Sequence, residues 1–185
     1  AEPANIDFHI GLRAEHHARV ADLIPMAPRP PDQKRPTPDN PTPYPKIDVD
    51  TNSEEWRSAE IPSTNGHGSA RALARLYGAL ATGTDLDGVT ILQPATIEAA
   101  TQEQAYGEDA VLGRVTRFGL GFQLAMAERP LGPNPSTFGH FGAGGSLGFA
   151  DPDARLGFGY AMNRGRSGWQ HRHVRHLIDV LYEAL

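Results

Sequence analysis

Residues 138–163 constrain the fold most, because they hold two strand-like runs with a turn between them. Residues 147–150 and 156–162 are apolar or small, and residues 151–155 between them contain an Asp-Pro pair, which favours a turn. We therefore expect one strand over residues 142–150, paired antiparallel with the second run. This stretch should form one edge of a functional site.

Glycines are dense at the start of this hairpin, with four in seven positions: Gly142, Gly144, Gly145 and Gly148. Where a residue has no side chain, its backbone N–H group can come close to a ligand. His140 stands at the entrance to the hairpin. A lone histidine is more often a hydrogen-bonded structural residue than a catalyst, so the residues alone leave both roles open for His140.

Composition excludes several classes of protein. The formal net charge is −5, which argues against nucleic acid or an anionic membrane surface as a partner, because both need a basic face. No apolar run approaches the roughly 18 residues of a membrane span. The chain has no cysteine, so it has no disulfide, thiolate nucleophile or thiolate metal site. Its 185 residues suit one domain or part of one.

Residues 25–45 contain nine prolines in 21 positions. That density blocks helices and strand ladders, so the segment is either a connector or a loop draped over the domain. Thr51–Glu54 has the pattern of a capping box, which predicts a short helix that carries Trp56. A core position is more common than a pocket position for such an aromatic residue.

Three more helices and one strand are expected. Apolar spacing predicts helices over residues 70–81 and 169–185, and Pro94 should begin another that ends near Gln104. The helix over residues 169–185 should close over one face of the sheet. Residues 117–124 alternate small and large side chains, as a strand does, and should pair with the His140 strand. Asn65 and His67 precede the first helix and could face a cleft, although helix capping is the preferred role.

Two other patterns in the sequence resemble chemical sites but lack the context that such sites need. Gly144–Gly148 fits the Gly-x-Ser-x-Gly elbow of lipases, but an elbow needs a helix after its serine, whereas Ser146 leads into a strand and a turn. The histidines at 171, 173 and 176 lie among arginines on the last expected helix, and His16-His17 point in different directions on a helix. No metal site is expected from either group.

The order His-x-Gly, glycine-containing strand, Asp-Pro turn and Leu-Gly-x-x-Tyr-x-x-Asn resembles the end of the serine β-lactamase and penicillin-binding-protein superfamily, closest to its class C-related esterases. The residues Ala70–Arg75 match a helix of these esterases. The resemblance implies an α+β fold, in which an antiparallel β-sheet flanked by helices forms the C-terminal portion of the β-lactamase/DD-peptidase-like α/β sandwich. It also implies that His140, Phe141 and Gly144 contact substrate, and that Gly142 and the Ala143 N–H form the oxyanion side.

The resemblance also requires a Ser-x-x-Lys nucleophile and a Tyr-x-Asn-like base. The only lysines, Lys34 and Lys46, follow Pro31 and Pro43 by three residues, so no Ser-x-x-Lys is present. Residues 1–185 are therefore interpreted as the C-terminal part of a serine esterase, inactive alone. The expected partners are a small-molecule ester and the N-terminal half, with no cofactor and no metal. The alternative is a non-catalytic fragment or ligand-binding module that keeps the groove.

Overall fold

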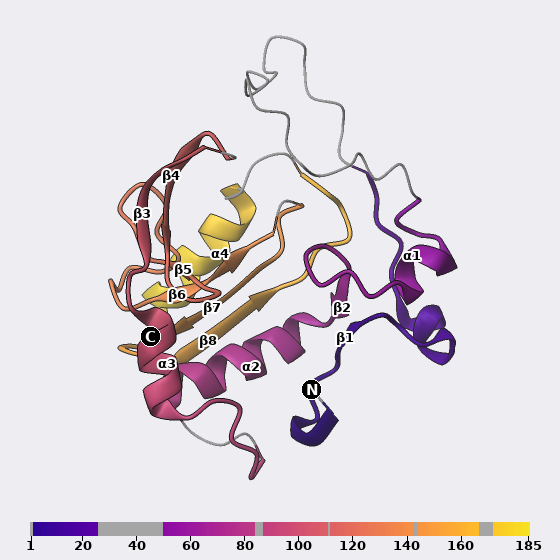
Figure 1. Cartoon of the computed structure of the whole chain (residues 1–185), viewed down its shortest axis with the longest axis horizontal. Coiled ribbons are helices and arrows are strands. Elements are labelled where there is room, and N and C mark those ends of the chain that lie inside the picture. The colour runs from indigo at the N-terminus through magenta and orange to yellow at the C-terminus, as the bar shows by residue number, and fades with distance from the viewer. Residues whose placement is uncertain (1, 26–49, 84–86, 111, 143, 167–171) are drawn as a thin grey trace.

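The computed structural model describes residues 2–25, 50–83, 87–110, 112–142, 144–166 and 172–185. Its centre is a six-stranded antiparallel sheet in which each strand pairs with the next along the chain (Figure 1). The strands are β3 (Ala105–Asp109), β4 (Arg114–Phe118), β5 (Gln123–Leu124), β6 (Phe138–Phe141), β7 (Leu147–Asp151) and β8 (Leu156–Tyr160). The expected α+β fold with an antiparallel sheet and flanking helices is confirmed.

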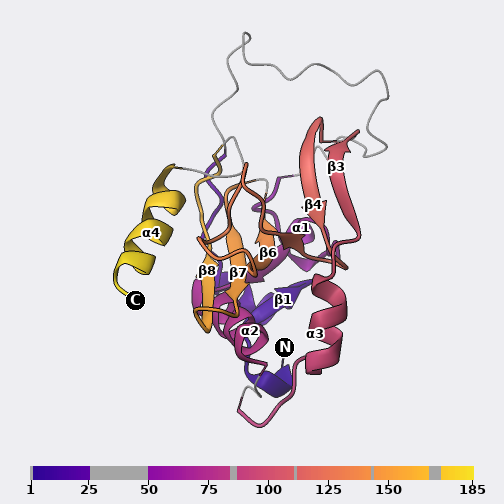
Figure 2. The ribbon, with the colours of Figure 1, turned by 90° about the vertical axis from the view of Figure 1, so that its left-hand side faces the viewer.

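The sheet separates two helices. On one side α2 (Ala70–Thr82) runs along β8, and on the other lies α4 (Arg172–Glu183), as Figure 2 shows. Alternate residues of β7 serve the two sides, because Phe149 packs with residues of α4 whereas Ala150 packs with residues of α2. The expected helix over residues 70–81 and the closing position of the last helix are therefore confirmed; residues 169–171 lie outside the described chain.

Glycines allow α2 to approach β8 closely. A Cβ atom on Gly157 would overlap the backbone of α2 at Gly78 and Ala74, and one on Gly159 would overlap the Ala70 carbonyl oxygen. The helix and the strand therefore touch backbone to backbone, where any side chain would push them apart. These two positions, which the sequence presents as ordinary strand glycines, fix the distance between the helix and the sheet.

The turn between β7 and β8 is held by the carboxylate of Asp151, which is fully buried. It accepts hydrogen bonds from the Ala154 N–H at 3.0 Å, from Asn134 Nδ2 at 2.9 Å and from the Tyr182 hydroxyl of α4. Burial, together with this bond to Asp151, raises the pKa of Tyr182. The Asp-Pro turn is confirmed, and its aspartate also ties α4 to the sheet.

The N-terminal residues form a smaller unit beside the main sheet, with β1 (Phe8–Ile10) paired antiparallel to β2 (Gly66–Gly68). It also contains the 3₁₀ helices η1 (Glu2–Ala4) and η2 (Ala14–Arg19) and the short helix α1 (Glu54–Ser58). Trp56 on α1 is buried, which confirms its expected core position. Ser53, not Thr51, caps α1, because its Oγ accepts the Trp56 N–H at 3.2 Å.

Two expected strands and one expected helix have different boundaries in the structure. The expected strand over residues 142–150 begins only at Leu147, because Gly142 belongs to a turn after β6. The expected strand over residues 117–124 is two strands, since the chain reverses after Phe118. α3 (Pro94–Thr101) ends before Gln104, which pairs instead with β4. Residues 26–45 of the proline-rich segment 25–45 lie outside the described residues. Among the described helices, none is long and apolar enough to cross a membrane.

Candidate active site

His140 is the one exposed residue of β6, while its three strand neighbours are buried. It lies opposite Gly148 of β7, and a side chain on Gly148 would overlap the ring of Tyr77 on α2. Paired residues share a face of a sheet, so His140 projects from the α2 side. Phe141 points the other way and packs against Leu147 in the core below α4. The strand thus presents an imidazole on one side and anchors itself on the other.

A tight backbone turn follows β6. The Gly142 N–H donates to the Ser146 carbonyl at 2.7 Å, and the Gly142 carbonyl accepts from the Gly145 N–H at 3.0 Å. A Cβ on Gly142 would overlap Ser146 Oγ, so that hydroxyl group would have to move, and Gly145 has a φ of 112°, a conformation that favours glycine. Two backbone hydrogen bonds of Gly142 therefore close this turn. Ala143, the expected oxyanion donor, lies outside the described residues.

Gly144 links this turn to the segment after β8. Its carbonyl accepts a hydrogen bond from the Arg166 N–H at 3.1 Å, and a Cβ at Gly144 would overlap the end of the Met162 side chain. The turn is therefore supported from the β8 side as well as from within. Gly142, by contrast, has both backbone polar groups engaged inside the turn, so its own N–H is not offered to a ligand.

The imidazole of His140 is held mostly neutral. The surrounding protein removes water from part of the ring, and this desolvation lowers the pKa of His140. A backbone hydrogen bond at Phe141 raises the pKa, and the positive charge of Arg114 lowers it further. The Phe118 ring lies 6.3 Å away, centroid to centroid. A neutral imidazole can donate or accept one hydrogen bond but offers little charge to an anionic ligand.

Ser146 does not stand on a nucleophile elbow. It is the last residue of the glycine turn, and the strand β7 begins at Leu147 directly after it. An elbow would place a helix there. The expectation that a strand, and not the helix of an elbow, follows Ser146 is confirmed.

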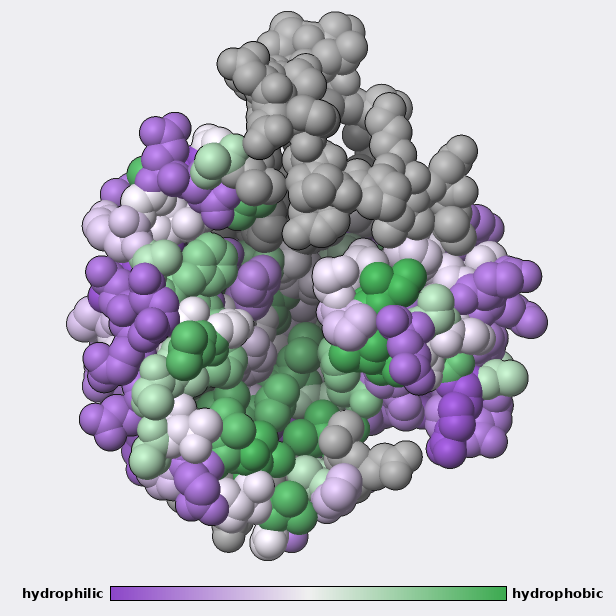
Figure 3. All heavy atoms as spheres, viewed as in Figure 1, coloured by the Kyte–Doolittle hydropathy of each residue, from purple (hydrophilic) through white to green (hydrophobic). Residues whose placement is uncertain are grey.

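A recess opens on the face seen in Figure 1. Figure 3 shows it between the sheet and the β1–β2 unit, with apolar residues along its floor and both apolar and polar residues around its rim. A concave apolar surface with a few polar groups at its edge is the usual form of a ligand site.

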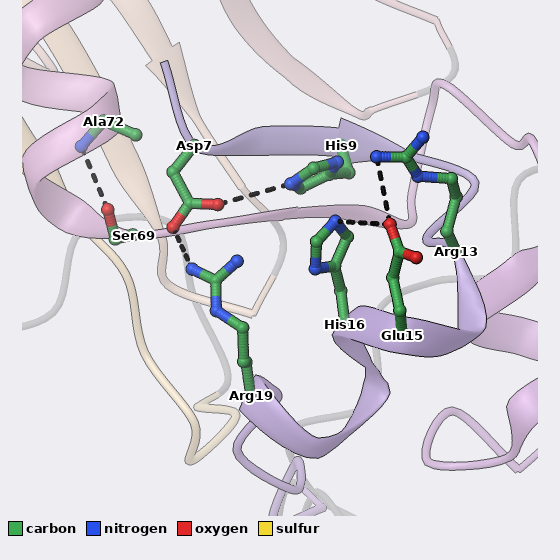
Figure 4. Close-up of polar contacts among 8 residues, drawn as sticks. All are labelled: Asp7, His9, Arg13, Glu15, His16, Arg19, Ser69 and Ala72. Carbon is green, nitrogen blue, oxygen red and sulfur yellow. Dashed lines mark hydrogen bonds and ion pairs between the residues drawn. The ribbon is translucent and has the colours of Figure 1, made fainter. Parts of the chain in front are cut away.

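Histidines and charged residues gather on the β1–β2 unit (Figure 4). His9 lies opposite His67 in the strand pair, and its ring lies 5.0 Å from that of His16. The carboxylate of Asp7 bridges His9 and Arg19, and Glu15 similarly bridges His16 and Arg13. Among the described residues no group of three or more such side chains is arranged to hold a metal ion.

Neither of the two residues expected to cap α2, Asn65 and His67, is its N-cap. Asn65 is buried, and its Nδ2 donates to the carbonyls of Trp56, at 2.9 Å, and Ala59, so it ties the end of α1. The cap of α2 is Ser69, whose Oγ accepts the Ala72 N–H at 3.1 Å (Figure 4). The expected capping of α2 by Asn65 is therefore wrong, because the side chain reaches back to the preceding helix.

His67 should make stability fall in acid. Burial lowers the pKa of His67 against a backbone hydrogen bond at Asn65 that raises it, and the charges of Arg57, His17 and His9 act in the same direction as burial. In the unfolded chain the His67 imidazole takes up a proton near pH 6.5, whereas in the folded chain it does so only at lower pH. The free energy of unfolding should therefore decrease as the pH falls below about 6.5.

Urea unfolding at pH 7.5 and pH 5 measures this decrease. His67→Gln should make it smaller, and His173→Gln, at an exposed position of α4, controls for the loss of a histidine. An equal decrease in the wild type and His67→Gln would contradict the prediction.

Comparison with known proteins agrees with this geometry. Residues 2–183 match the family model described as Beta-lactamase. The chain is 38% identical over 106 residues to the Esterase/beta-lactamase LipL of Mycobacterium tuberculosis. The aligned region covers 57% of this chain and 24% of LipL. These matches confirm the resemblance stated on the sequence.

Solved structures extend the comparison to the whole chain. A penicillin-binding protein homolog from Caulobacter crescentus superposes with a TM-score of 0.87 at 39% identity, over 100% of this chain and 50% of that one. A family VIII carboxylesterase superposes with a TM-score of 0.81 at 36% identity, over 98% of this chain and 48% of that one. The chain thus spans about half the length of these two solved proteins. It belongs to the beta-lactamase family.

Proposed function

We propose that this chain forms the oxyanion side of a serine esterase active site whose nucleophile and base come from an N-terminal half. The observation that carries the proposal is the bonded glycine turn after β6, which holds Gly142 and Gly144 by backbone hydrogen bonds on both sides of Ala143. Such preorganised backbone is what an oxyanion donor needs, because it must be in place before charge develops. Family membership and the half-length match to a carboxylesterase support the proposal.

The reaction would follow the usual course of acyl transfer to serine. The hydroxyl of an upstream serine, activated by its lysine and a tyrosine, attacks the ester carbonyl carbon, and the carbonyl oxygen becomes an oxyanion that the Ala143 N–H stabilises. The intermediate collapses, the alcohol leaves with a proton, and an acyl-enzyme remains. Water then attacks the acyl-enzyme in the same way and releases the acid.

His140 favours uncharged esters over substrates that carry a carboxylate. A lysine at this position would present a permanent positive charge, whereas the imidazole of His140 is mostly neutral because its pKa is lowered by desolvation. We therefore assign His140, Phe141 and Gly144 to substrate positioning. Of these, His140 would contact the ester directly, since Phe141 is buried.

The test compares residues 1–185 alone with the same residues joined to the N-terminal half. With p-nitrophenyl butyrate, the chain alone should release nitrophenol no faster than buffer, and the complete protein should show a burst followed by turnover. Hydrolysis by the chain alone that Ser146→Ala abolishes would overturn the proposal. A complete protein that binds the ester without hydrolysing it would instead be a ligand-binding module, the alternative that the missing Ser-x-x-Lys makes possible.

A further inference from the structure

The strand ladder of the sheet is interrupted beside the proposed oxyanion edge. β5 has only two residues, Gln123 opposite Gly139 and Leu124 opposite Phe138. The residues before it cannot continue the ladder, because the Gly119 N–H donates to the Phe122 carbonyl at 2.9 Å and the Leu120 N–H donates to α3. The ladder between β5 and β6 therefore ends at Gly139, and the last residues of β6, His140 and Phe141, have no β5 residue opposite them.

The side chain of Gln123 takes the place of the missing strand. Its Oε1 accepts the Phe141 N–H at 3.2 Å, across a gap that main-chain atoms would otherwise fill. No strand of the described sheet other than β5 pairs with β6 on this side, and Phe141 and Gln123 also line a cavity of about 20 Å³ together with residues of β4. One side-chain carbonyl thus satisfies a backbone donor at the edge of the site.

The bond acts on the residue that enters the turn. Phe141 is 4% exposed and is packed below α4, and the next residue, Gly142, makes both backbone hydrogen bonds of the turn. A change in the direction of the Phe141 N–H would rotate the His140–Phe141 peptide, which lies one residue before the turn, while the buried Phe141 ring resists translation.

We infer that Gln123 is a positioning residue for the proposed oxyanion edge, which it orients through the Phe141 N–H without contacting substrate itself. The inference rests on the proposed function and adds to it a residue that belongs to no motif. Gln123→Met keeps the size of the side chain and removes the acceptor, whereas Gln123→Glu keeps an acceptor at the same reach.

The experiment uses the complete protein and two measurements. In Gln123→Met, hydrogen exchange of the Phe141 amide should become at least about 10-fold faster, and kcat should fall about 10- to 100-fold with KM within about twofold, as for a small displacement of catalytic geometry. Gln123→Glu should keep the Phe141 amide protected and turn over faster than Gln123→Met. Gln104→Met, at an exposed position before β3, is the matched control and should change neither quantity.

The outcomes distinguish a failure of the role of Gln123 from a failure of the esterase assignment. If the wild type turns over ester and folded Gln123→Met keeps its kcat or its Phe141 protection, the role of Gln123 is wrong while the esterase assignment stands. If the wild type hydrolyses no ester, both fail. Gln123→Asn, whose amide is one methylene shorter and cannot reach Phe141, gives the same readouts should the methionine variant not fold.

Discussion

Replacing Ala143 with proline in the complete enzyme should lower kcat by about 10²- to 10³-fold, the usual cost of removing one oxyanion donor. Proline has no N–H group, so this substitution deletes the proposed donor. A side-chain change at His140 leaves that donor in place, and we expect His140→Ala to cost less in kcat than Ala143→Pro. Initial rates with p-nitrophenyl butyrate measure both effects.

Ala143→Gly is the matched control, because it alters the same position and keeps the N–H group. It should retain most of the turnover. Circular dichroism must show that Ala143→Pro is folded, since proline also restricts the residue before it. A folded Ala143→Pro enzyme with near-normal kcat would show that the turn after β6 is not the oxyanion edge.

Replacing Gly157 with alanine should destabilise the fold by about 3 kcal/mol, at the upper end of the cost of overpacking. The added Cβ would overlap the Gly78 nitrogen and the Ala74 carbonyl oxygen. Both are backbone atoms of α2, so no side chain can rotate away, and the helix itself must move off β8. Chemical denaturation of the complete protein, followed by fluorescence, gives the change in the free energy of unfolding.

Gly78→Ala tests whether the effect comes from the contact and not from loss of a glycine. A Cβ on Gly78 meets no atom within 4 Å in the described structure. Because alanine favours a helix interior over glycine by roughly 0.5–1 kcal/mol, this variant should be slightly more stable than the wild type. Equal destabilisation by both variants would contradict the close-contact explanation.

The elements found from the sequence are those with a local signal. The hairpin of β7 and β8 has apolar runs around an Asp-Pro turn, and α2 and α4 have apolar spacing that persists through the helix. β3 was missed because four of its five residues are exposed, so the strand shows no alternation. β1 and β2 have three residues each and depend on one another for their hydrogen bonds.

The remaining differences come from contacts between distant residues. The alternation over residues 117–124 predicts one strand, but the Leu120 N–H bonds to the Ala100 carbonyl of α3 and the chain turns there. His140 lies on β6, which directly precedes the glycine turn, and its role in the site stays a prediction. The role proposed for Gln123 could not be predicted from the sequence, because it depends on a contact between residues 18 positions apart. Only the structure shows that Gln123 Oε1 lies 3.2 Å from the Phe141 nitrogen.

The outer edge of β8 has a consequence for handling the chain by itself. β8 pairs with β7 on one side and is the last strand of the described sheet, and Leu156–Tyr160 contains no charged residue and no proline. Strand edges of this kind are templates for further strands, and soluble proteins usually protect them with charges, prolines or bulges. Two copies of this chain held at high concentration could therefore join edge to edge through β8, so aggregation would compete with the capture of an N-terminal half.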